Sequence, residues 1–188
     1  MILQGKTINF LGDSITESTG ASCPENGYVA VFERTFGLKE ARNYGVGGSR
    51  FASQEKPWGP PRMERNFCLR ATDMDENADA VVVFGGTNDS WSNAPLGNEM
   101  SEGWERTDLY NVLPAIGYFF TELRRVLPDA KIYGICNCDI KNEVRDAIRH
   151  ASERVGGKAI VLESIDKLNG HPTPLGMVQI KDQVLAAV

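Results

Sequence analysis

Four short motifs, spread along the chain, carry the residue types that transfer of an acyl group requires. Ser14 closes the triplet GDS, Gly48 closes the run NYGVGG, Asn88 lies in GGTND, and His171 lies in NGHP. A serine hydroxyl attacks an ester carbonyl once a nearby base takes its proton, and imidazole exchanges protons readily near neutral pH. Backbone and amide N–H groups can stabilise the oxyanion that then forms. Together the motifs predict acyl-transfer chemistry.

The identity of the base follows from the histidine content. The chain has two histidines. His150 lies in RDAIRHASERV, a charged segment whose apolar residues recur at helical spacing. We expect it at the surface of a helix, away from the other motifs, so a histidine base must be His171.

Each of these residues also has a purely structural role open to it. Ser14 could cap a helix, and Asn88 could close a turn together with Asp89. His171 could be a solvated loop residue. The combination of a nucleophile, a base and two N–H donors favours the catalytic roles over these separate ones.

The elements that must position the motifs alternate between strands and helices. Short apolar runs predict strands over residues 7–11, 42–45, 80–84, 131–136 and 158–162. Helical spacing predicts helices over residues 27–37, 61–76, 110–127, 141–155 and 174–187. This alternation indicates an α/β fold with three layers, α/β/α, and we expect a five-stranded parallel sheet with the flavodoxin-like order 2-1-3-4-5. Ligands of such sheets bind beyond the carboxyl ends of the strands, where all four motifs fall.

Length and composition exclude several classes of protein. A chain of 188 residues is expected to form a single domain, residues 1–188, and its net charge of −5 argues against a nucleic-acid partner. No apolar run approaches the length of about 20 residues that a membrane span needs. The first residues, MILQGKTINF, lack the features of a secretion signal, which predicts a cytoplasmic location. Cys136-Asn137-Cys138 is too isolated for a zinc site, and no cofactor motif is present.

The chain resembles the SGNH hydrolase superfamily, also called the GDSL-like lipases, esterases and acylhydrolases. The triplet GDS resembles the first sequence block of that superfamily, whose serine is the nucleophile, so the resemblance assigns this role to Ser14. Gly48 and Asn88 fall on the oxyanion-hole positions of the second and third blocks. His171 falls on the base of the last block. The resemblance implies an ester hydrolase that forms an acyl-enzyme and needs no metal or cofactor.

One position departs from the pattern of the superfamily. An aspartate usually stands three residues before the histidine, and here that position is Leu168. Asp166 stands five residues before His171, and we take it as the candidate third member of a triad. Asn169 or a backbone carbonyl could orient the imidazole instead, which would make the site a dyad.

All three tryptophans lie in two long segments, residues 50–61 and 90–106, that leave the carboxyl ends of predicted strands. Trp58, Trp91 and Trp104 are candidates for a substrate-binding wall, because flat aromatic faces suit sugars and acyl chains alike. Alternatively, they could pack these loops onto the domain or form the contact of a homodimer.

The leading functional prediction is a serine esterase that removes a small acyl group, such as acetyl, from a carbohydrate or another small metabolite. A lipase or lysophospholipase is the related alternative. A different class is a flavodoxin-like carrier, since residues 14–20 also resemble a loop that binds the phosphate of FMN. A third alternative, motivated by Leu168, is a catalytically silent member of the same fold that binds a glycan.

Overall fold

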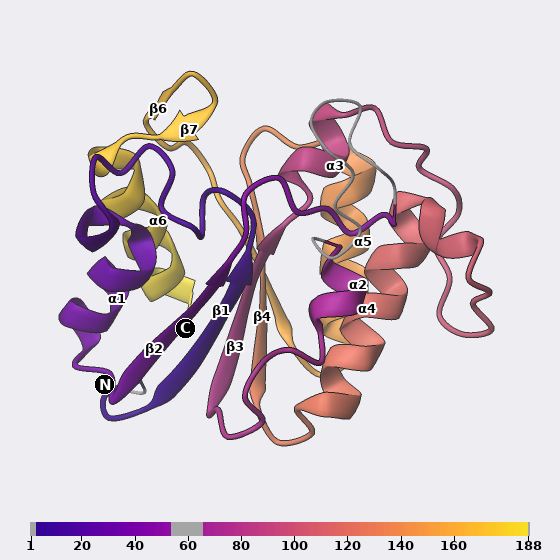
Figure 1. Ribbon diagram of the computed structural model, residues 1–188, viewed down its shortest axis with the longest axis horizontal. Coiled ribbons are helices and arrows are strands. Elements are labelled where there is room, and N and C mark those ends of the chain that lie inside the picture. Colours follow the sequence, from indigo (N-terminus) through magenta and orange to yellow (C-terminus); the bar gives the residue numbers. More distant parts are fainter. Residues whose placement is uncertain (1–2, 54–65, 188) are drawn as a thin grey trace.

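The computed structural model describes residues 3–53 and 66–187 and shows a parallel sheet of five strands in the order β2-β1-β3-β4-β5 (Figure 1). The prediction of an α/β fold with this strand order is confirmed. The strands are β1 (Thr7–Gly12), β2 (Glu40–Gly45), β3 (Ala80–Gly85), β4 (Lys131–Cys136) and β5 (Lys158–Val161).

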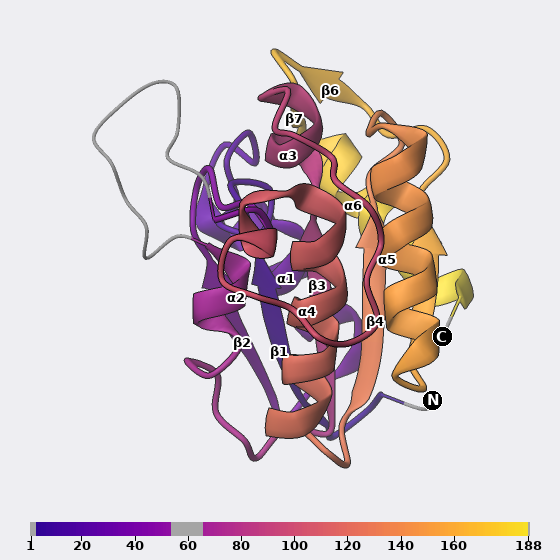
Figure 2. The ribbon, with the colours of Figure 1, turned by 90° about the vertical axis from the view of Figure 1, so that its right-hand side faces the viewer.

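Helices cover both faces of the sheet and form the outer layers (Figures 1 and 2). On one face lie α1 (Tyr28–Phe36) and α6 (Pro174–Ala187). On the other lie α2 (Phe67–Arg70), α4 (Val112–Val126) and α5 (Asn142–Arg154). None of the helices in the described part of the chain is long and apolar enough to cross a lipid bilayer.

The central strand β3 lies entirely within the hydrophobic core. All six of its residues are buried, since helices pack on both of its faces and strands pair with both of its edges. A strand covered in this way carries apolar side chains without alternation, which is the pattern of residues 80–84. The edge strand β2, by contrast, has no buried residue.

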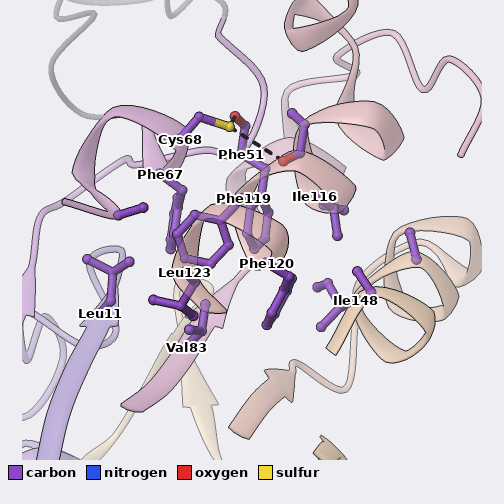
Figure 3. Packing of buried hydrophobic residues seen from close by; sticks show 14 of the residues in the cluster. Leu11, Phe51, Phe67, Cys68, Val83, Ile116, Phe119, Phe120, Leu123 and Ile148 are labelled. Atoms are coloured by element: carbon purple, nitrogen blue, oxygen red, sulfur yellow. Dashed lines mark hydrogen bonds between the residues drawn. The ribbon is translucent and has the colours of Figure 1, made fainter. Parts of the chain in front are cut away.

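An aromatic cluster fixes the segment that follows β2. Phe51 stacks on Phe67 of α2 with ring centroids 4.6 Å apart, and it meets the ring of Phe119 of α4 at 5.4 Å (Figure 3). The thiol of Cys68 lies within hydrogen-bonding distance of the Phe51 carbonyl oxygen, at 3.5 Å. Because Phe51 follows Gly48 by three residues, this cluster holds the glycine-rich turn of residues 45–48 in place.

The prediction of a helix over residues 61–76 is wrong in its extent. Residues 61–65 lie outside the described residues, and the helix that follows, α2, ends at Arg70. After Arg70 the chain runs through turns and bends to β3 at Ala80. The N–H of Asp75 donates to the hydroxyl of Tyr44 at 3.1 Å, and the carboxylate of Asp75 accepts the N–H of Asn77 at 2.7 Å. Both bonds engage backbone N–H groups with side chains in place of helical carbonyls.

Two short elements near the carboxyl edge were not predicted. Helix α3 (Thr87–Trp91) begins directly after β3. Strands β6 (Lys167–Leu168) and β7 (His171–Pro172) form an antiparallel hairpin whose turn residues, Asn169 and Gly170, have φ of 51° and 81°. Asn-Gly is the preferred sequence for such a two-residue turn, so the signal for this hairpin was present in the sequence.

Candidate active site

The structure brings Ser14 and His171 together at the carboxyl edge of the sheet. Ser14 lies two residues beyond the end of β1, and His171 begins β7 of the hairpin. The Oγ atom of Ser14 is 3.0 Å from the Nε2 atom of His171, although the two residues are 157 positions apart. This separation is within the reach that a general base needs to take the hydroxyl proton.

The backbone around Ser14 forms a series of turns in place of a regular helix. The carboxylate of Asp13 accepts the N–H of Ile15 at 2.9 Å, and the carbonyl of Asp13 accepts the N–H of Glu17 at 3.0 Å. The N–H of Thr19 donates to the carbonyl of Ser14. The hydroxyl of Ser14 faces His171 and does not cap a helix, so the helix-cap alternative does not describe this residue.

The backbone N–H groups of Ser14 and Gly48 are the two main-chain candidates for binding an oxyanion. Gly48 has a φ of 74°, in the left-handed region that glycine adopts without strain. A side-chain carbon built on Gly47 would come within 3.8 Å of Ser14 Cβ, which shows that this turn runs beside the serine. Within the described residues, no acceptor is bound to the N–H of Ser14 or of Gly48.

Asn88 of α3 lies at the same place, with its amide nitrogen fixed by two acceptors. Its Nδ2 atom donates to the carbonyl of Ser49 at 3.0 Å and has a longer contact of 3.4 Å with Oδ2 of Asp13. The carbonyl of Ser49 accepts hydrogen bonds only, so the nitrogen end of the amide faces Ser49 and Asp13. The contact with Asp13 is the longer and therefore the weaker of the two.

Two buried carboxylates hold the loops that carry these groups. The oxygens of Asp89 accept the N–H groups of Phe51 and Ala52, both at 3.0 Å. Burial raises the pKa of Asp89 to about 6. Burial also raises the pKa of Asp13 to about 7, and the nearby charge of Asp89 adds to this effect. Their bonds to backbone N–H groups give both residues a structural role.

Sequence reasoning missed Arg70, which connects the ends of two strands. Its buried guanidinium donates to the hydroxyl of Ser49 at 2.8 Å and to the carbonyl of Gly12 at 3.4 Å, and it also bonds the carbonyl of Tyr44. Arg70 therefore ties the end of β1, which leads to Ser14, to the end of β2. No sequence signal identified it, because an arginine in an amphipathic segment is usually solvated.

Asp166 is not positioned as the third member of a triad. Its carboxylate accepts the hydroxyl of Thr173, and its carbonyl accepts the N–H of Thr173 at 3.0 Å. Among the described residues, no hydrogen bond joins Asp166 or Asn169 to the ring of His171. The carboxylate is committed to the start of α6, where Thr173 caps the helix by accepting the N–H of Gly176.

Leu168 occupies the position where the superfamily usually has its aspartate. It pairs directly with His171 across the hairpin, and its side chain is 69% exposed. Within the described part of the chain, the imidazole of His171 bonds Ser14, and no acid, Asn169 amide or backbone carbonyl bonds it. His150, the other histidine, is exposed, and its Nδ1 lies 3.1 Å from the carboxylate of Glu99, in agreement with the predicted surface position.

The three tryptophans have different surroundings. The ring of Trp91, at the end of α3, lies against Gly170 of the hairpin: a side-chain carbon built there would come within 2.8 Å of the ring. Trp91 remains 45% exposed. Trp104 packs edge-on against Tyr118 of α4, with ring centroids 5.7 Å apart. Trp58 lies outside the described residues.

The described residues contain no cluster of three or more His, Cys, Asp or Glu side chains arranged to hold a metal ion. Cys138, which follows β4, is an exposed free cysteine.

The residue before it, Asn137, is buried and donates through its amide to the hydroxyl of Thr87, the first residue of α3. This bond links the end of β4 to the helix that carries Asn88.

Residues 51–188 match the model of the family described as GDSL-like lipase/acylhydrolase. The chain belongs to this family. The matched region includes Asn88 and His171, and the fold adds Ser14 and Gly48 at the same edge of the sheet. None of the curated proteins matches the chain.

Solved structures similar to this GDSL-like hydrolase cover almost its whole length. A protein described as a GDSL-like lipase from Bacteroides uniformis is 30% identical, with a TM-score of 0.88 over 98% of this chain and 95% of that one. One from Bacteroides ovatus is 26% identical, with the same TM-score over 97% of each chain. A family two carbohydrate esterase from Clostridium thermocellum, solved as an active-site mutant, is 17% identical and shares the fold with a TM-score of 0.70, over 98% of this chain and 63% of that one.

Membership of this family makes the protein an ester hydrolase of the lipase and esterase class. It also removes the basis for the flavodoxin-like alternative. Residues 14–20, which resembled a loop for the phosphate of FMN, form the turns that present the hydroxyl of Ser14 to His171.

Proposed function

We propose that this hydrolase removes a small acyl group, such as acetyl, from a carbohydrate or another small metabolite, through a Ser14–His171 dyad. The observation that carries the proposal is the 3.0 Å separation of Ser14 Oγ and His171 Nε2 beside two unengaged backbone N–H groups. Such a pair activates a serine only when base and hydroxyl are within hydrogen-bonding reach.

The geometry supports a reaction in two stages. Ser14 Oγ attacks the ester carbonyl carbon while Nε2 of His171 takes its proton, and the N–H groups of Ser14, Gly48 and Asn88 stabilise the resulting oxyanion. The intermediate collapses, the bond to the alcohol breaks, and the imidazolium returns the proton to the leaving alkoxide. Water then gives a proton to His171 and attacks the acyl carbon. The bond to Ser14 Oγ breaks, and the imidazolium returns the proton to Oγ, which releases the acid and restores Ser14.

A small polar ester is favoured by the groups around the dyad. Trp91 offers a half-exposed flat ring next to the hairpin that carries His171, and such rings bind the faces of sugars. A similar fold in carbohydrate esterases agrees with this substrate class. The exposed Leu168, directly across the hairpin from His171, favours a lipase or lysophospholipase as the second candidate.

Hydrolysis of p-nitrophenyl acetate tests the dyad. We expect Ser14→Ala and His171→Ala to lower kcat by at least about 10³-fold, because each removes a group that acts in both stages. His150→Ala is the matched control, since it removes the exposed second histidine and should leave kcat unchanged. Wild-type rates in both dyad variants would remove Ser14 and His171 from the mechanism, and an inactive wild type would favour the silent glycan-binding alternative.

The substrate class is tested with the same enzyme. Release of acetate from acetylated monosaccharides is compared with hydrolysis of p-nitrophenyl esters of increasing acyl length, from acetyl upward. A carbohydrate esterase should show a higher KM for the sugar ester in Trp91→Ala, with an unchanged KM for p-nitrophenyl acetate. Rates that rise steadily with acyl length would instead favour the lipase alternative.

A further inference from the structure

The hairpin that carries His171 has few bonds of its own. Its strands β6 and β7 comprise two residues each, and they project beyond the sheet above α6 (Figure 1). A two-stranded hairpin of this length is not stable in isolation. The position of the imidazole must therefore be fixed by contacts between the hairpin and the rest of the domain.

One side of the hairpin is held by the turns that follow Ser14. A side-chain carbon built on Gly20 would come within 3.0 Å of His171 Cβ and within 2.5 Å of the carbonyl oxygen of Pro172. Only a glycine allows the backbone to approach this closely. These contacts limit motion of the histidine toward the nucleophile loop, but they leave the other strand of the hairpin unsupported.

The other strand is held by Lys167, whose side chain is only 14% exposed. Its Nζ donates to Oδ1 of Asn137 at 2.9 Å and forms an ion pair with Asp139 at 2.8 Å. Both partners follow the end of β4. Lys167 thus bonds the hairpin directly to the carboxyl edge of the sheet, over a separation of 30 residues.

Asn137, a partner of Lys167, also bonds α3, the helix that carries Asn88. Asn137 accepts from Lys167 through Oδ1 and donates through Nδ2 to the hydroxyl of Thr87 at 3.2 Å. Thr87 precedes Asn88 in α3. One chain of hydrogen bonds therefore connects the element that carries the base to the element that carries an oxyanion donor.

We propose that Lys167 is a positioning residue that holds the imidazole of His171 against Ser14, the task that a triad aspartate performs in related sites. This inference rests on the proposed function of the dyad. A triad acid fixes the orientation of the ring through a bond to its Nδ1 atom. Here Lys167 fixes the backbone that carries the ring, because no described residue bonds Nδ1.

The test uses the intact chain with p-nitrophenyl acetate. Lys167→Met removes the bonds to Asn137 and Asp139 and keeps a similar side-chain volume. We expect kcat to fall roughly 10- to 100-fold, since a small displacement of a catalytic group has about this cost, while KM stays within about twofold. Lys167→Arg, which can bond the same partners, should recover most of kcat. A Lys167→Met variant with kcat within twofold of wild type would overturn the proposal.

A double-mutant cycle separates positioning from a general structural role. If Lys167 acts through His171, then Lys167→Met should cause no further loss in a His171→Ala background. An equal loss in both backgrounds would overturn the proposal, because the lysine would then act on something other than the base. If His171→Ala itself has wild-type activity, the dyad fails, whereas failure of Lys167→Met alone leaves the dyad intact.

Two further variants separate a specific effect of Lys167 from a general loss of stability. Lys181→Met is the matched control: that lysine is 12% exposed and pairs with Asp182 on α6, and its loss should leave kcat unchanged. Asp139→Ala removes an exposed partner of Lys167, and we expect a smaller fall in kcat that disappears in the Lys167→Met background. A fall that persists there would contradict the proposed route through Lys167.

Discussion

The two halves of the candidate active site are held by different kinds of contact. The nucleophile half, formed by residues 12–15, 47–52 and 86–89, is bound by buried polar groups: Asp13, Ser49, Arg70 and Asp89 are all buried and bonded to neighbouring loops. The hairpin of residues 167–172 has one buried residue, Pro172, and its side-chain bonds to the rest of the domain come from Lys167 and His171.

This difference follows from where the elements lie in the fold. Two loops of the nucleophile half follow the central strands β1 and β3. Each of these strands is paired on both edges, so the starting positions of the two loops are fixed by the sheet. The hairpin belongs to a separate two-stranded sheet. Donors that stabilise an oxyanion work best when they are already in place, and burial provides this preorganisation.

Beyond the dyad itself, the largest expected effect is on the nucleophile half. Asn88→Ala removes the side-chain N–H donor that we propose for the oxyanion, and we expect kcat for p-nitrophenyl acetate to fall by about 10²- to 10³-fold. Asn93→Ala is the control, because Asn93 lies two residues beyond α3 and its side chain bonds the exposed side chain of Lys141. A fall of less than about tenfold for Asn88→Ala would place the asparagine outside the oxyanion hole.

The next prediction concerns how much the buried bonds of the nucleophile half contribute to the free energy of unfolding. Asp89→Ala leaves the buried N–H groups of Phe51 and Ala52 without their acceptor, so the free energy of unfolding should fall by roughly 2–4 kcal/mol. Urea unfolding measures this change. Asp182→Ala, an exposed aspartate on α6, should change stability by less than about 0.5 kcal/mol. Equal losses for the two variants would contradict the contrast drawn above.

The buried carboxylates also predict how stability depends on pH. Burial raises the pKa of Asp13 from 3.8 to about 7. Between pH 4 and 7 the folded protein therefore holds a proton that the unfolded chain releases, so the free energy of unfolding falls as pH rises, by up to about 1.4 kcal/mol per pH unit. Urea unfolding at pH 5, 6 and 7 should show this slope.

Two variants assign part of the slope to Asp13. Asp13→Asn should reduce it most clearly between pH 6 and 7, because the raised pKa of Asp89, about 6, leaves a second contribution at lower pH. Asp79→Asn is the control, since bonds to Lys6 and to the N–H of Thr7 lower the pKa of Asp79, which places its titration below this window. Stability that increases from pH 5 to 7 in the wild type would show that Asp13 is ionised throughout.

The smallest effect is expected in the hairpin half, at Asp166. Its carboxylate bonds Thr173, so Asp166→Ala should leave kcat within about threefold of wild type. Loss of a true triad acid costs roughly 10⁴-fold. Glu163→Ala, at an exposed position in the same connection, is the control. A loss of about 10²-fold or more at Asp166 would show that its carboxylate reaches the imidazole during catalysis.

Much of the fold could be predicted from the sequence because burial leaves a local pattern. The unbroken apolar residues 80–84 indicated a strand covered on both faces, and Thr173-Pro174 indicated the start of the last helix. The helix expected over residues 61–76 ends early where a non-local contact intervenes. The N–H of Asp75 bonds the hydroxyl of Tyr44 on β2, a partner that lies beside it only in the folded chain.

The sequence by itself indicated the alternation of strands and helices and the positions of the chemical groups at strand ends. Only the tertiary structure decided what surrounds those groups: that Asp166 serves Thr173, that Arg70 joins β1 to β2, and that Lys167 connects the hairpin to β4. The reason is physical. A motif records which atoms are present, whereas hydrogen bonds between distant residues depend on distances that exist only after the chain has folded.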